Sequence, residues 1–113
     1  AIYAAGIKPD WWKLEPQHSA LAWKNIEATI AANDDYCRGI VLLGLEAPAA
    51  ELEKAFAATT VAPSVKGFAV GRTIFAHAAQ QWLSGQMTDE AAIADMAGRF
   101  EELTRAWLRT RGL

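Results

Sequence analysis

The stretch Asp10-Trp11-Trp12-Lys13-Leu14-Glu15 decides how the chain is interpreted. It is short and largely apolar, as expected for a β-strand. Side chains alternate across a strand, so Lys13 and Glu15 share one face while Leu14 points to the other. A buried ammonium is costly without a partner, and a lysine in a dry pocket can lose its proton and act as an amine nucleophile. We therefore expect a buried strand with Lys13 as a candidate catalytic residue.

Two further stretches, Gly39 to Leu45 and Val65 to Gly71, also favour buried strands, because each is apolar and bounded by proline, glycine or charged residues. The segments between the strands have helical periodicity. One helix is expected to run from an N-cap at Ser19 to Asn33, and another to begin at Pro48. This alternation is typical of right-handed βαβ units, which predicts three parallel strands in an α/β fold.

After the third strand, the pattern predicts a short helix over residues 76–83 and a long C-terminal helix over residues 88–109. Apolar residues in the long helix recur at alternating steps of three and four. This stripe could dock on the sheet or on a second chain, and its short length favours docking within the chain's own fold. The stripe consists of Ile93, Met96, Phe100, Leu103 and Trp107.

Length and composition predict one domain over residues 1–113, because 113 residues with 52% hydrophobic content supply one modest core. The net charge is −2 and the cations are scattered, so neither nucleic acid nor a membrane surface is an expected partner. Cys37 is the single cysteine, which excludes an intrachain disulfide. No targeting or membrane-spanning segment is visible, and the expected location is cytoplasmic.

A three-stranded parallel sheet leaves two edges unpaired, and such strands normally need cover on both faces. The chain also opens without a methionine, on what resembles a last helical turn, Tyr3 to Ala5, closed by Gly6. We therefore expect a fragment of a longer chain. Either further strands of the native polypeptide or additional copies of this chain would complete the sheet.

A second candidate site lies where the third strand ends, in the run from Lys66 to Phe75. Gly71 permits close backbone approach to a ligand, and Arg72 near a helix start suits phosphate oxygens. The alternative is a glycine turn with Arg72 paired to a surface carboxylate. His18 and His77 have no ligand-type spacing, so we expect surface or capping roles for them and no metal site.

The three strand motifs, in this order and spacing, resemble the C-terminal part of class I tagatose-bisphosphate aldolases. They are similar in particular to the aldolase-like domain fused to the sugar kinase in bacterial 5-dehydro-2-deoxygluconokinases of myo-inositol catabolism. The resemblance covers essentially the whole chain. It implies the last three strand-helix units of a TIM (β/α)8 barrel.

The resemblance also implies roles for individual residues. Lys13 would be the Schiff-base lysine of a Lys-x-Glu motif, and Glu15 would be the nearby carboxylate that moves protons. Gly71 and Arg72 would bind the substrate phosphate, with Gly44 at the rim. The implied reaction is reversible carbon-carbon cleavage of 6-phospho-5-dehydro-2-deoxygluconate or a similar keto-sugar phosphate, with no cofactor and no metal.

The chain departs from the full family pattern because a barrel takes roughly 250 residues. Acid, base and lysine residues on the earlier strands would be missing, so we expect little or no aldolase activity from these 113 residues alone. The competing hypothesis is a non-catalytic α/β assembly or regulatory module attached to a carbohydrate kinase.

Overall fold

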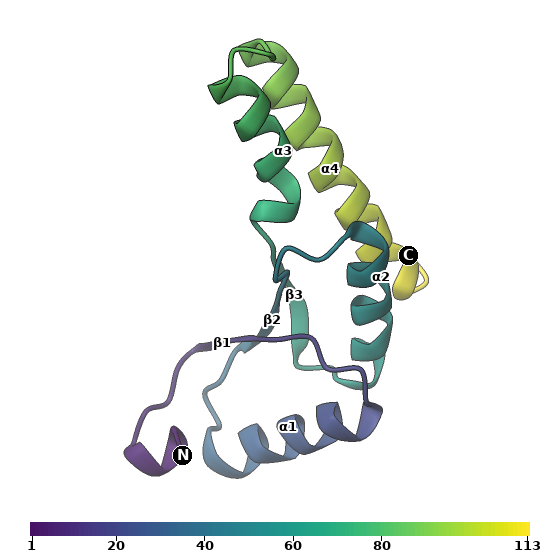
Figure 1. Ribbon diagram of the computed structural model, residues 1–113. Helices are drawn as coiled ribbons and strands as arrows, with labels where there is room; N and C mark the ends of the chain where they lie inside the picture. Colours follow the sequence, from purple (N-terminus) through teal and green to yellow (C-terminus); the bar gives the residue numbers. More distant parts are fainter.

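A computed structural model describes residues 1–113 and shows a small parallel sheet with helices packed against it (Figure 1). A helical hairpin projects from one end of the sheet. In chain order the elements are η1 Tyr3–Ala5, β1 Trp11–Leu14, α1 Ala20–Asn33, β2 Gly39–Leu43, α2 Ala49–Ala58, η2 Thr59–Val61, β3 Val65–Ala69, α3 Arg72–Leu83 and α4 Asp89–Thr110.

The sheet has the order β1-β2-β3, and both strand pairs are parallel, which confirms the expected α/β class. Lys13 pairs with Val41 and Leu14 pairs with Leu42. Between β2 and β3 the register shifts at Ile40, so Val41 pairs with Gly67. Strands added in chain order by crossovers of one hand place their helices on one face of the sheet.

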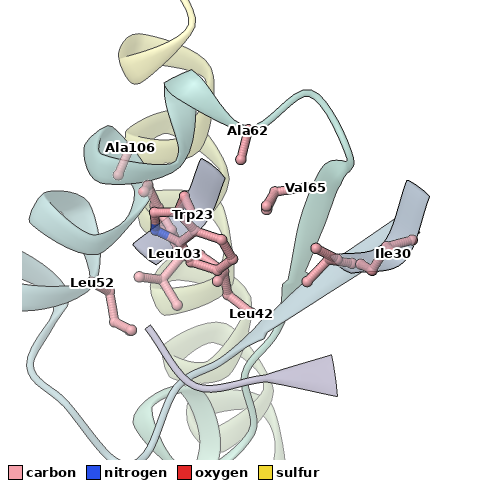
Figure 2. Packing of buried hydrophobic residues seen from close by; sticks show 10 residues of the cluster. Trp23, Ile30, Leu42, Leu52, Ala62, Val65, Leu103 and Ala106 are labelled. Carbon is pink, nitrogen blue, oxygen red and sulfur yellow. The ribbon is translucent and has the colours of Figure 1, made fainter. Parts of the chain in front are cut away.

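The hydrophobic core lies on that helix-covered face (Figure 2). Three helices and two strands contribute to it, which explains why the apolar stripes of the sequence point inward. Trp23 is fully buried, and its indole Nε1 donates a hydrogen bond to the carbonyl of Gln17 at 3.0 Å. The buried cluster comprises Trp23, Ile30, Ile40, Leu42, Leu52, Phe56, Ala62, Val65, Leu103 and Ala106.

The opposite face of the sheet is open. Val41 and Leu43 of the central strand are only half-buried there, and Lys13 is exposed. The prediction that the first strand is buried is therefore wrong for this face. The physical reason is that the helices cover only the side of β1 that carries Trp12 and Leu14, both half-buried, and no element packs on the other side.

Helix starts follow the capping residues at two of the predicted positions. The side chains of Ser19 and Thr88 accept hydrogen bonds from backbone amides three residues later, at 3.4 and 3.2 Å. The helix predicted over residues 76–83 instead begins at Arg72, because the Gly71 carbonyl accepts from the amides of Ile74 and Phe75. No helix has the combination of length and apolar character that crossing a membrane requires.

The apolar stripe of α4 is divided between two environments. Leu103 is buried in the core, and the ring of Trp107 packs edge-on against Phe56 at a centroid distance of 5.3 Å. Toward the start of the helix, Ile93 and Phe100 are 64% and 53% exposed. Docking of the stripe on the chain's own fold is thus confirmed for Leu103 and Trp107. The N-terminal half of α4 packs on α3, to which Asp89 and Asp95 are bound.

Candidate functional site

A hollow of about 350 Å³ lies at the carboxyl edge of the sheet. In open parallel sheets, ligands bind outside the carboxyl ends of the strands. The hollow is formed by β1, the loop after β2 and the loop after β3. Four of the five residues that the sequence singled out line it, namely Lys13, Gly44, Gly71 and Arg72, together with Glu46 and Phe75 among others.

Lys13 lies on the open face of β1, where its side chain reaches the hollow. It takes part in none of the five ion pairs of the structure and donates no hydrogen bond to another side chain. A lysine amine becomes a nucleophile at neutral pH when dry surroundings disfavour its charged form. The position of Lys13 suits this chemistry, whereas its exposure to water does not.

Glu15 is not brought into the hollow. The strand ends at Leu14, so the alternation that placed Glu15 beside Lys13 stops one residue too early. The carboxylate of Glu15 is exposed and has no ion pair, and its backbone carbonyl accepts from Gln17 Nε2 at 3.2 Å. The geometry therefore gives Glu15 no contact with the other candidate residues.

The start of α3 supplies the anion-binding features expected of the third loop. Gly71 is the N-cap, and the amides of Arg72 and Thr73 have no backbone acceptor. The Arg72 guanidinium forms an ion pair with Glu46, and both side chains are more than half exposed. Exposed pairs contribute about 0–1 kcal/mol, so an incoming phosphate can compete for Arg72.

The loop after β2 has a strained backbone. The amide of Ala47 donates to the carbonyl of Gly44 at 2.9 Å, and φ is 49° at Leu45 and 60° at Glu46. Two central residues with positive φ define a type I′ turn, which usually takes asparagine and glycine. The Thr73 hydroxyl donates to the Ala47 carbonyl at 3.0 Å, so α3 holds the strained turn in place.

Gly44 has a packing role that the sequence does not reveal. A Cβ atom at this position would lie 2.7 Å from Val70 Cγ1. The family resemblance implies that Gly44 is a small residue at the rim that leaves room for substrate. In the structure the missing side chain also allows the loops after β2 and β3 to approach each other, which brings Glu46 close to Arg72.

Sequence reasoning missed Glu46 and Phe75. Glu46 is the carboxylate that pairs with Arg72, the residue predicted to bind phosphate. The only feature of the sequence that indicates Glu46 is its position just after a buried parallel strand. Phe75 forms part of the wall of the hollow, and a Cβ atom added at Gly71 would lie 3.1 Å from Cε1 of its ring. No group of three or more histidine, cysteine, aspartate or glutamate side chains is arranged to hold a metal ion.

Comparison with protein-family models places residues 1–111 in a family described as an uncharacterized protein conserved in bacteria, DUF2090. The chain belongs to this family. Neither the curated proteins nor the solved structures gave a match. The matched residues include all nine elements of the fold up to the end of α4 and the residues that line the hollow.

Proposed function

We propose that this chain is the C-terminal part of a (β/α)8 barrel of the class I sugar-phosphate aldolase type, similar to the aldolase-like domain of 5-dehydro-2-deoxygluconokinases. The observation that carries the proposal is the convergence of Lys13, Gly44, Gly71 and Arg72 on one hollow at the carboxyl edge of the sheet. These residues come from three successive strand-loop units, and active sites of barrels are built from such loops.

The arrangement of the sheet supports a barrel segment. Its strands are parallel and lie in chain order, and its core lies on one face only. In a closed barrel the helices cover the outer face, and the inner face is filled by side chains from the remaining strands. The open face with Lys13, Val41 and Gly67 would then be the inner face of the barrel.

The proposed chemistry begins with attack of the Lys13 amine on a substrate carbonyl. Water leaves and a protonated imine forms, which accepts the electron pair of the carbon-carbon bond as that bond breaks. Arg72 and the free amides at the start of α3 would bind the substrate phosphate. Binding would release Glu46 from Arg72 inside the hollow, so Glu46 is better placed than Glu15 to move protons.

The experiment is reductive trapping. The polypeptide that joins this chain to the remaining barrel strands is incubated with 6-phospho-5-dehydro-2-deoxygluconate and sodium borohydride, and the adduct is located by mass spectrometry. We expect modification of Lys13, lost in Lys13→Arg and weakened in Arg72→Gln. The chain's other lysines, Lys24 and Lys54 among them, are internal controls. An unmodified Lys13 at saturating substrate would refute the aldolase proposal.

A second candidate function is a non-catalytic assembly or regulatory module. The exposure of Lys13 and the separation of Glu15 from the hollow favour it. A retro-aldol assay on the 113-residue chain tests whether further barrel strands are needed for activity. We expect little or no turnover, because the inner face is open to water, and turnover comparable to that of a complete barrel would contradict the need for further strands.

A further inference from the structure

One acidic side chain lines the candidate hollow, and it is bound to the cation that the proposed phosphate site needs. Glu46 is the single carboxylate among the lining residues, and it pairs with the guanidinium of Arg72. Carboxylates and phosphates both match the fork of N–H donors that a guanidinium presents. In the structure, a carboxylate of the chain itself therefore occupies the group to which a substrate phosphate would bind.

A costly backbone conformation directs Glu46 toward Arg72. The φ angles of Leu45 and Glu46 are 49° and 60°, in the left-handed region that is unfavourable for residues with a Cβ atom. Such conformations persist only where the surrounding contacts fix them, and they cluster at ligand sites and switch regions. A positive φ also sets the direction of the Cα–Cβ bond, so the ion pair between Glu46 and Arg72 depends on this turn.

Two hydrogen bonds fix the turn independently of the ion pair. The amide of Ala47 donates to the Gly44 carbonyl at 2.9 Å, and the Thr73 hydroxyl donates to the Ala47 carbonyl at 3.0 Å. Thr73 directly follows Arg72, so the start of α3 holds both the turn and the cation. The carboxylate of Glu46 therefore stays within reach of Arg72 after an anion displaces it. A competitor tethered in this way acts at an effective concentration in the millimolar range.

The exposure of the ion pair limits how strongly it can compete. The side chains of Arg72 and Glu46 are 66% and 52% exposed. An exposed pair of this kind changes an equilibrium by about fivefold at most. A phosphate can overcome this competition because it carries more charge and more acceptor oxygens than a carboxylate. Its further oxygens can accept from the amides of Arg72 and Thr73, which have no backbone acceptor.

We propose that Glu46 is an autoinhibitory carboxylate, which competes with the substrate phosphate for Arg72 and lowers the affinity of the hollow for anions. This inference rests on the phosphate site of the proposed function. By linkage, the factor by which a bound anion weakens the ion pair equals the factor by which the ion pair weakens anion binding. The coupling between Glu46 and Arg72, measured without any anion, therefore predicts how much affinity is gained when Glu46 is neutralised.

The first test is an NMR titration of the 113-residue chain with inorganic phosphate at constant ionic strength, followed at the amides of Arg72 and Thr73. We expect Glu46→Gln to bind phosphate about two- to fivefold more tightly than the parent. Glu51→Gln is the matched control, because Glu51 is an exposed carboxylate that lines a neighbouring hollow with Leu45 and forms no ion pair. Circular dichroism checks that both variants fold.

The second test is a double-mutant cycle of Glu46→Gln and Arg72→Gln in urea denaturation without phosphate, whose coupling should match the affinity gain within about twofold. An unchanged affinity in Glu46→Gln overturns the autoinhibition and leaves the phosphate site standing, as does an equal gain in Glu51→Gln. Phosphate binding that Arg72→Gln does not weaken overturns the phosphate site of the proposed function, and the autoinhibition with it.

Discussion

Gly44→Ala is the sharpest perturbation of the candidate site that the structure offers. The added Cβ would lie 2.7 Å from Val70 Cγ1, 3.0 Å from Cγ2 and 3.2 Å from Cβ. Carbon atoms prefer separations of about 3.5–4.0 Å, so Val70 would have to move by roughly 0.8 Å. Val70 is β-branched and directly precedes Gly71 and Arg72, so its movement displaces the loop that carries them. Overpacking of this kind costs about 1–3 kcal/mol.

The assay is urea denaturation followed by tryptophan fluorescence, since Trp23 is fully buried and reports the loss of the core. Val70→Ala in the same chain removes the two clashing methyl carbons, so the double variant should recover at least about 1 kcal/mol relative to the sum of the single effects. Gly98→Ala is the control, because nothing lies within 4 Å of its added Cβ in α4. That change should stabilise the chain by about 0.5–1 kcal/mol. The predicted clash is refuted if Gly44→Ala leaves the free energy of unfolding unchanged within experimental error. It is also refuted if Val70→Ala does not restore any of the stability that Gly44→Ala removes.

Three further changes test other parts of the fold. Leu45→Gly should stabilise the chain by about 0.5–1 kcal/mol in the same denaturation assay, because the relief of about 1–2 kcal/mol of αL strain at this exposed residue exceeds the cost of about 0.5–1 kcal/mol from the backbone entropy that glycine adds to the unfolded chain. Phe56→Ala should cost about 3–5 kcal/mol, because the ring is fully buried between Phe68 and Trp107; a loss below 1 kcal/mol would contradict this packing. The pKa of Asp95 is lowered chiefly by its hydrogen bond from the Arg99 side chain. A lowered folded-state pKa stabilises the protein above the ordinary value of 3.8, and the gain disappears as pH falls through the folded value. The melting temperature of the Asp95→Asn variant should therefore lie furthest below that of the parent at neutral pH, and the two melting temperatures should converge in acid. Thermal melts from neutral to acid pH measure this difference.

The sheet and most helices could be predicted from the sequence because local patterns determine them. Continuous apolar runs bounded by glycine or charge gave the strands to within two residues at each end, and Ser19 and Thr88 marked two helix starts. The start of α3 was placed four residues late. Thr73 and Ile74 are β-branched and favour strands, yet they form the first turn because the Gly71 carbonyl caps it.

The candidate site could be predicted only in part, for a reason that concerns tertiary structure. The carboxyl ends of neighbouring parallel strands meet at one edge, so the convergence of Lys13 with Gly71 and Arg72 follows from order alone. The partnership of Arg72 with Glu46 does not. It depends on positive φ at Leu45 and Glu46, and neither residue type signals that conformation.

Whether Lys13 is chemically competent depends on what covers the open face of the sheet. Side chains on the helix-covered face, such as Ile40 and Leu42, are fully buried, whereas Val41 and Leu43 on the same strand are not. Cover over the open face would dry the surroundings of Lys13 and bury this apolar surface at once, at about 25 cal/mol per Å². Stability and nucleophilicity are thus coupled through one surface. A polypeptide segment that docks on the open face should raise both the unfolding midpoint of the chain and the rate at which borohydride traps the keto-sugar phosphate on Lys13. A segment that raises only the midpoint would indicate that the open face serves assembly alone.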